Sequence, residues 1–186
     1  MNYTLRHSAV ILSGLIGFFI PALFALDIYK NNLEQNLATW SMVLFMDMLG
    51  VILAFKAGNK RPLLQMGWLA AAVLILSAIC LSKSSWHWGV IETLSLISCI
   101  AAVYLWQTRS ARHGIYFYVI AGYVSFFPQI ADYWKTPQPG TLYLWLTTVI
   151  ACTLAIYGAE KRDFANTFVP IAFGLLNVLI AVLVLR

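Results

Sequence analysis

Two polar side chains lie inside long apolar runs, where their presence is costly. Asp47 stands between two methionines near the middle of the run 38–57, and Asn177 lies within 164–185. A carboxylate at the centre of a membrane helix costs about 2.5–3.5 kcal/mol on insertion scales, and such residues commonly face a cavity or relay protons. An amide at that depth can bind a solute or only join helices. We predict that Asn177 contacts a solute and that Asp47 contacts a solute or couples transport to protons, with a structural hydrogen bond to a neighbouring helix as the alternative for each.

Three prolines, Pro21, Pro128 and Pro170, also lie inside apolar runs. A proline within a helix removes one backbone hydrogen bond and bends the helix. Pro21 and Pro128 fall at similar depths in their respective runs, as paired hinges around a central site would. We therefore predict that the three prolines are hinge positions, although prolines are also common in membrane helices in general.

Polar residues near two run ends complete the predicted gating group. Gln129 directly follows one of the prolines, and Asp27 and Asp132 stand three residues before Lys30 and Lys135. The two aspartates are predicted either to make gate contacts with these lysines or to be solvated helix ends.

The histidines and cysteines do not form a catalytic or metal-binding pattern. His7, His87 and His113 all lie at the ends of apolar runs, and the three cysteines form no CxxC pair. The motifs HExxH and GxSxG are absent, and so is a pair of acidic residues. We predict that the chain is not an enzyme and has neither a cofactor nor a metal site.

The composition requires lipid around the elements that carry these residues. Of 186 residues 61% are hydrophobic and 10% are charged, against about 25% charged in a soluble domain. The net charge is +5, but the cations lie in short gaps between apolar runs, so membrane topology accounts for them and nucleic acid is not an expected partner. Seven runs approach the length of about 20 residues that a membrane-spanning helix needs. They are 9–26, 38–57, 63–81, 86–106, 114–131, 141–159 and 164–185.

The Lys and Arg residues predict an orientation. Eight of them fall at the N-terminus and in the second, fourth and sixth gaps, and four fall on the other side. Because cytoplasmic loops carry the excess of cations, the N-terminus is predicted to be cytoplasmic and the C-terminus to lie outside.

The ends of the runs indicate an internal repeat. Segments 27–30 (Asp-Ile-Tyr-Lys) and 132–135 (Asp-Tyr-Trp-Lys) resemble each other, as do 53–61 and 154–162. Three helices are an odd number, so one further helix is needed before a second unit can enter the membrane in the same direction. The predicted organisation is a first three-helix repeat at 1–82, a spacer helix at 83–108 and a second repeat at 109–186.

Short motifs in the second half resemble those of a transporter superfamily. The segment 127–130 (Phe-Pro-Gln-Ile), followed by Lys135 and Thr136, is similar to the PQ-loop signature. The pair 157–158 (Tyr-Gly), followed by Pro170 and an Asn seven residues later, resembles the end of a SWEET or SemiSWEET unit. The resemblance covers roughly residues 115–185 and is weak over 9–81.

This resemblance implies a 3+1+3 transporter with its solute held between the two units near mid-membrane. SWEETs carry sugars, and lysosomal PQ-loop relatives carry amino acids, some with protons. Asn177 then corresponds to the solute-binding Asn and Pro128 to the proline that bends the first helix of a unit, and we add Tyr157 to the predicted solute site. Leu154 stands where SWEET units often have Trp, and Leu76 stands opposite Asn177. The usual SWEET orientation places the N-terminus outside, against the charge count.

The sequence therefore predicts an all-α integral membrane protein of seven transmembrane helices, arranged as two parallel three-helix bundles joined by a spacer helix. The predicted function is transport of a small polar solute by alternating access, with sugar as the first class and amino acid as the second, and with proton linkage as an option. The alternative is a seven-helix sensor or assembly subunit that binds without transport. We expect the bilayer as a partner, homo-oligomers as an option, and a bacterial inner membrane as the location.

Overall fold

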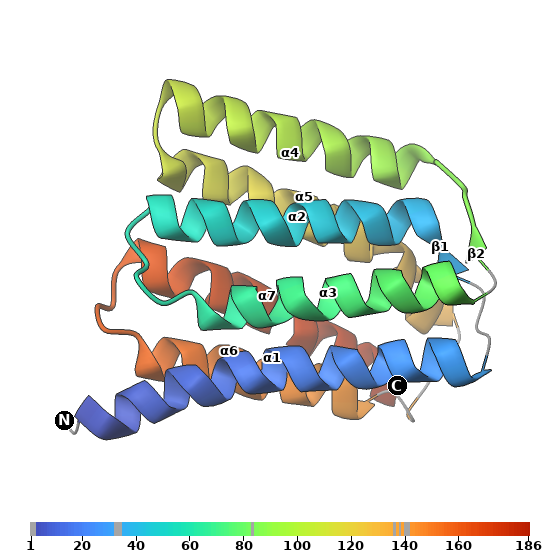
Figure 1. Cartoon of the computed structure of the whole chain (residues 1–186), viewed down its shortest axis with the longest axis horizontal. Coiled ribbons are helices and arrows are strands. Elements are labelled where there is room, and N and C mark those ends of the chain that lie inside the picture. The colour runs from blue at the N-terminus through green and yellow to red at the C-terminus, as the bar shows by residue number, and fades with distance from the viewer. Residues whose placement is uncertain (1–2, 32–34, 83, 136, 138, 140–141) are drawn as a thin grey trace.

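The computed structural model describes residues 3–31, 35–82, 84–135, 137, 139 and 142–186, and these form long helices that run back and forth (Figure 1). Each apolar run predicted from the sequence overlaps a helix. The α-helices of the described residues are α1 Tyr3–Asn31, α2 Leu37–Lys56, α3 Leu63–Leu81, α4 Val90–Thr108, α5 Ala111–Lys135, α6 Leu142–Gly158 and α7 Phe164–Leu185. Two strands of two residues, β1 Gln35–Asn36 and β2 Ser84–Ser85, pair in parallel.

Within the described residues, five helices are both long and apolar enough to cross a membrane, namely α1, α2, α3, α4 and α7. Helix α6 is apolar but has 17 residues, and α5 has 25 residues. The fold is therefore all-α with the long apolar helices of an integral membrane protein. Seven spans remain a prediction.

The helix boundaries have local causes. Asn36 precedes α2, and its side-chain oxygen accepts a hydrogen bond from Ala38 N at 3.1 Å, which satisfies one of the free N–H groups of the first turn. Helix α2 ends before Gly58, which has a φ of 103°, a conformation that favours glycine. Asp163 caps α7 in the same way as Asn36 caps α2, by accepting from Asn166 N at 3.2 Å.

The helices pack in two groups of the same internal order. Helix α3 contacts both α1 and α2, and α7 contacts both α5 and α6. Between the groups, α1 packs against α6 and α2 packs against α5. Helix α4 packs mainly on α5 and to a smaller extent on α2, so it lies at the side of the molecule (Figure 1).

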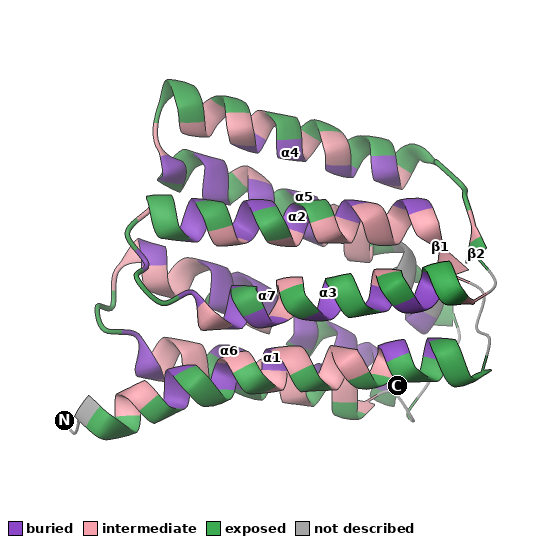
Figure 2. Ribbon diagram, in the orientation of Figure 1, coloured by how far each residue is buried: buried purple, intermediate pink, exposed green. Residues whose placement is uncertain are grey.

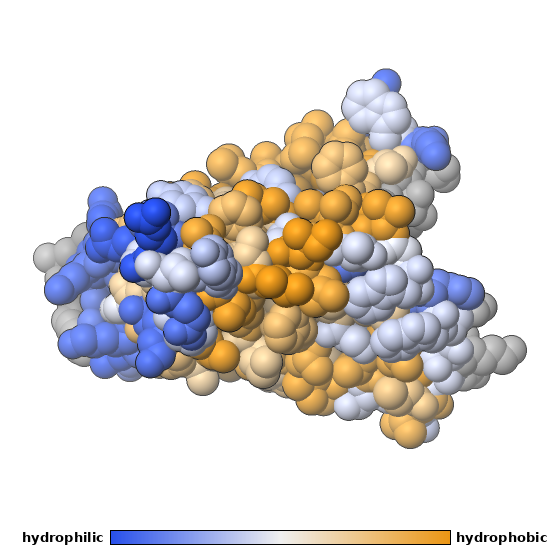
Figure 3. Space-filling model, turned by 90° about the horizontal axis from the view of Figure 1, so that it is seen from above, coloured by the Kyte–Doolittle hydropathy of each residue, from blue (hydrophilic) through white to orange (hydrophobic). Residues whose placement is uncertain are grey.

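The outer surface is apolar along the helices and polar at their ends. Large hydrophobic residues such as Val90, Leu175 and Val182 are more than half exposed. Figure 2 shows exposed residues along much of α4, and Figure 3 shows hydrophobic residues over the middle of the visible face with hydrophilic ones gathered at one end. A surface of this kind indicates contact with the lipid bilayer.

The N-terminus lies at one end of the molecule, together with the connections α2–α3, α4–α5 and α6–α7 (Figure 1). Helices α1, α3, α5 and α7 begin at this end. These are the segments that the charge count grouped on one side, so their grouping is confirmed. Which side of the membrane they face remains a prediction.

At the opposite end, a group of hydrogen bonds joins the α1–α2 and α3–α4 connections. Glu92, in the first turn of α4, accepts from Thr39 Oγ1 at 2.5 Å and from Gly89 N at 3.0 Å. Asn36 Nδ2 donates to His87 O at 2.8 Å, and His87 N donates back to Asn36 Oδ1 at 3.1 Å. Glu92 is buried, so these hydrogen bonds replace the ones that its carboxylate would make with water.

Glu92→Ala is expected to lower the free energy of unfolding by about 1–3 kcal/mol, because the Thr39 hydroxyl and the Gly89 N–H lose their partner. Glu160→Ala is the matched control. It removes an exposed carboxylate whose ion pair with Arg61 is worth at most about 1 kcal/mol. Thermal denaturation in detergent checks the difference, and an equal loss of stability in both variants would contradict the structural role of Glu92.

Candidate functional site

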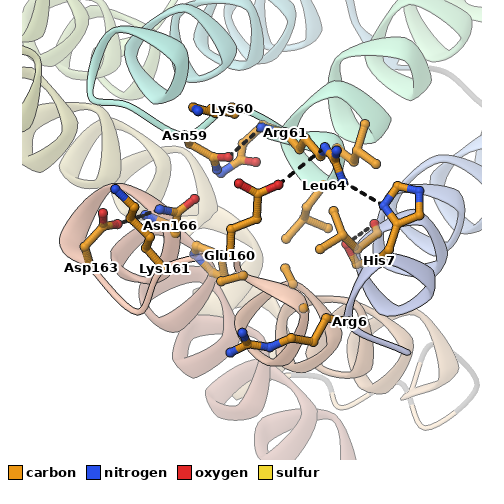
Figure 4. A pocket seen from close by; sticks show the side chains of 18 of the residues that line it. Arg6, His7, Asn59, Lys60, Arg61, Leu64, Glu160, Lys161, Asp163 and Asn166 are labelled. Atoms are coloured by element: carbon orange, nitrogen blue, oxygen red, sulfur yellow. Dashed lines mark hydrogen bonds and ion pairs between the residues drawn. The ribbon is translucent and has the colours of Figure 1, made fainter. Parts of the chain in front are cut away.

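A cavity of about 550 Å³ lies at the N-terminal end of the molecule (Figure 4). Helices α1 and α3 line one side of it, and α6 and α7 line the other, together with the α2–α3 and α6–α7 connections. Its volume is in the range of sites for small molecules. We call this cavity the vestibule and define it by Arg6, Ser13, Arg61, Gln65, Glu160 and Pro170.

Arg61, from the α2–α3 connection, bridges the two sides of the vestibule. Its Nη1 donates to His7 Nδ1 on α1 at 2.8 Å, and its Nε lies 3.6 Å from Glu160 Oε1. Figure 4 shows Arg61 between these two partners. The Arg61 and Glu160 side chains are 40% and 47% exposed, and ion pairs that water reaches to this extent are worth about 0–1 kcal/mol. The bridge is therefore weak enough to break and form again.

Deeper in the vestibule the lining becomes buried. Ser13 is fully buried and donates to Val10 O at 2.9 Å, and Gln65 is 3% exposed. Pro170, which we predicted as a hinge, lines the vestibule from α7. Of the residues predicted from the sequence for the solute site or the gate, Pro170 is the one described residue found in this cavity.

One helical turn beyond this lining, aromatic rings from both groups of helices meet. Trp68 on α3 packs edge-on against Phe173 on α7, with ring centroids 5.3 Å apart. The Phe173 ring also packs against Tyr118 and Tyr123 on α5, with ring centroids 5.8 and 6.5 Å apart. These four residues form the inner aromatic cluster. It fits together because Gly122 leaves room, since a Cβ there would lie 2.5 Å from the Phe173 ring.

Asp47 lies beside this cluster and does not line the vestibule. It is half-buried on α2, and Tyr118 is fully buried. Gly50, one turn further along α2, faces the Tyr118 ring, with a Cβ there lying 2.6 Å from the hydroxyl oxygen. In the described part of the chain no hydrogen bond or ion pair holds the Asp47 carboxylate, so the structural hydrogen bond considered from the sequence is not formed with any described residue.

The other two predicted solute contacts lie apart from the vestibule as well. Asn177 is 4% exposed, one turn beyond Phe173 on α7, and its Nδ2 donates to Phe173 O at 2.8 Å. This bond stays within its own helix. Tyr157 is half-buried on α6, next to Gly158, which does line the vestibule.

The remaining predicted gate residues are less informative. Pro21 is half-buried inside α1, and Asp27 and Lys30 are both exposed near its end without an ion pair between them. The side chains of Pro128, Gln129 and Asp132 lie outside the described residues. For Asp27 the structure thus favours the solvated helix end.

The sequence analysis did not predict the ion pair at the rim of the vestibule or the inner aromatic cluster. Arg61 and Glu160 lie in the two segments, 53–61 and 154–162, that we matched as repeats. The sequence showed that these segments resemble each other but not that the two residues form an ion pair. Trp68 and Phe173 are apolar residues in apolar helices, and no pattern separates them from lipid-facing neighbours. The polar residues at the ends of these two segments were the one sequence signal that could have indicated a charged rim.

The fold and this site define a helical membrane protein with a polar cavity at one end. Comparison with protein-family models, curated proteins and solved structures found no match. The resemblance of residues 115–185 to PQ-loop and SWEET proteins therefore remains a prediction from short motifs.

Proposed function

We propose that the chain is a membrane transporter that moves a small polar solute by alternating access between two three-helix bundles. The observation that carries this proposal is the position of the vestibule, between α1 and α3 on one side and α6 and α7 on the other. A cavity between two groups of helices can open and close when one group moves against the other.

The packing pattern supports the 3+1+3 organisation that the sequence predicts. In each half, the third helix contacts the first and the second, and the contacts between halves pair α1 with α6 and α2 with α5. Exchanging the two halves leaves this pattern unchanged, as expected for parallel repeats at 1–82 and 109–186. Helix α4, within the spacer 83–108, packs on α5 and α2 and does not line the vestibule.

The two ends of the vestibule support alternating access. At the rim, exposed Arg61 and Glu160 make a weak ion pair, and at depth the Trp68–Phe173 contact joins both halves. In this proposal the structure is the state in which the solute enters from the N-terminal side. Separation of the inner aromatic cluster then gives access to Asp47 and Asn177, of which Asp47 is the proton-linked group.

The charge distribution supports a cytoplasmic N-terminus, so that the vestibule faces the cytoplasm. Under the proposal the host membrane is a bacterial inner membrane, and sugars and amino acids are the first solutes to test.

The deciding experiment is uptake of labelled sugars and amino acids into liposomes containing the protein, with and without a pH gradient. We expect saturable uptake that Asp47→Asn and Asn177→Ala each reduce at least tenfold, with dependence on the gradient lost in the Asp47 variant. Met48→Ala and Leu175→Ala alter exposed neighbours on the same helices and should transport normally. Ligand binding without uptake of any solute would instead support a sensor or assembly subunit.

A further inference from the structure

We infer that the vestibule binds a small carboxylate anion where Arg6 and the start of α3 meet. The binding site is argued from contacts within the vestibule alone. That this anion is the transported solute rests on the proposed function, which it deepens by naming the chemical class.

The first argument is an unsatisfied cation. Among the described residues, Arg6 Nε is buried without a hydrogen-bond partner, although Arg6 lines the vestibule. Arg6 as a whole is half-buried, and its buried Nε–H lacks an acceptor, which a carboxylate oxygen would supply in a charge-assisted hydrogen bond. Arg61 does not have the same need, because Glu160 and His7 already contact it.

The second argument is a buried amide on the same cavity. Gln65, in the first turn of α3, is 3% exposed and lines the vestibule, and its side chain forms no hydrogen bond within the described part of the chain. An amide both donates and accepts, so it suits a ligand that carries a hydroxyl or carbonyl group beside its charge. The Gln65 amide is open to the cavity, so a ligand there can supply its hydrogen-bond partner.

The third argument is the direction of the helices. Helices α1, α3 and α7 all begin at the vestibule, and the partial positive charge of a helix start favours anions. Helix α7 already has a carboxylate at its start, since Asp163 caps it. Helix α3 begins after Pro62 without any side-chain cap, and its first residues, Leu63 to Gln65, line the cavity. Leu63 N donates to Arg61 O at 2.8 Å, so the N–H groups of this turn that remain available to an anion are those of Leu64 and Gln65.

The charges of the lining favour a carboxylate over a zwitterion or a neutral sugar. Four cationic side chains line the vestibule with two carboxylates, and both carboxylates are engaged. Glu160 pairs with Arg61, and Asp163 accepts from Asn166 Nδ2 at 2.6 Å. The ammonium group of an amino acid would find no free carboxylate, and a neutral sugar would leave Arg6 without a counter-charge.

The test is the binding of malate, a hydroxycarboxylate, to the full-length protein in nanodiscs of neutral lipid. Binding is measured as the rise in melting temperature with malate concentration. We expect saturable stabilisation, with a Kd raised about tenfold or more by Arg6→Gln and several-fold by Gln65→Leu. Arg112→Gln is the matched control, because it removes an exposed cation at the same end of the molecule that does not line the vestibule. Gln65→Leu keeps the test decisive if Arg6→Gln does not fold.

Several outcomes would overturn the inference. They are equal malate affinity in the Arg6 and control variants, stabilisation by glycine or glucose in place of malate, and equal stabilisation by inorganic phosphate. Loss of the malate effect in nanodiscs with anionic lipid would show that a headgroup occupies the site, which also overturns it. Uptake of labelled glucose by protein that does not bind malate would remove the inference and leave the proposed transport intact. Malate binding without uptake of any solute would leave the inferred anion site intact and remove the proposed transport.

Discussion

Phe173→Ala is expected to lower the free energy of unfolding by about 3–5 kcal/mol, the range for truncating a buried aromatic side chain. Phe173 is 7% exposed and contacts Trp68, Tyr118 and Tyr123, which come from two other helices. Removing its ring leaves a hole beside Gly122, which has no side chain to fill it. Thermal denaturation of the purified variant in detergent measures the loss.

Leu175→Ala is the control for this prediction. Leu175 lies two residues further along the same helix and is 62% exposed, so its truncation removes contacts with lipid and leaves the inner aromatic cluster intact. We expect a change below about 1 kcal/mol. If both variants lose the same stability, the inner aromatic cluster does not hold the two groups of helices together.

Gly67→Ala is the second substitution with a large expected effect. A Cβ at Gly67 would overlap the carbonyl oxygen of Gly14 on α1 and lie 3.2 Å from Phe18 N. Both are backbone atoms that cannot rotate away, so α1 and α3 would have to separate. We expect a loss of about 1–3 kcal/mol, as for overpacked cores, together with a lower yield of folded protein from membranes.

Gly174→Ala provides the comparison, because it is also a glycine inside a long helix. A Cβ there would lie 3.4 Å from Cys152 Cβ, which is an ordinary contact. Alanine also has a higher helix propensity than glycine, so this variant should be unchanged or slightly more stable. Size-exclusion profiles and melting temperatures of the two variants, measured side by side, test the prediction. A stable Gly67→Ala protein would mean that α1 and α3 do not approach so closely.

The positions of the helices could be read from the sequence because lipid imposes a strict length on apolar segments. The run 63–81 coincides with α3, and 164–185 coincides with α7. Polar gaps such as 58–61 marked the connections for the same reason, since charged residues avoid the hydrocarbon core. The grouping of these gaps at one end followed from the alternating direction of successive helices.

The rotation of each helix could not be read, and this is why the predicted site and the vestibule differ. In a membrane both the lipid-facing and the packed sides of a helix are apolar, so hydropathy does not mark the buried side. Asp47 and Asn177 were found because they are polar, but Asp47 lies beside the inner aromatic cluster and Asn177 one turn beyond it, so neither lines the vestibule. Arg6 and Gln65 lie near helix ends, where polar residues are common and therefore carry no signal.

Contacts between distant connections were equally hidden. The pairing of Gln35–Asn36 with Ser84–Ser85 joins two short segments whose residue types do not complement each other in any recognisable pattern. The ion pair between Arg61 and Glu160 depends on how the two groups of helices meet, which the repeat alone does not specify.

The contact between α1 and α6 also determines how the chain can be assembled during synthesis. Helices α1, α2 and α3 can pack together as soon as they have entered the membrane, since α3 contacts both of the others. The partner of the remaining side of α1 is α6, where Gly158 fits against Arg6 O and Val10 N, and α6 is made much later. Until α6 is inserted, this side of α1 therefore has no helix packed against it.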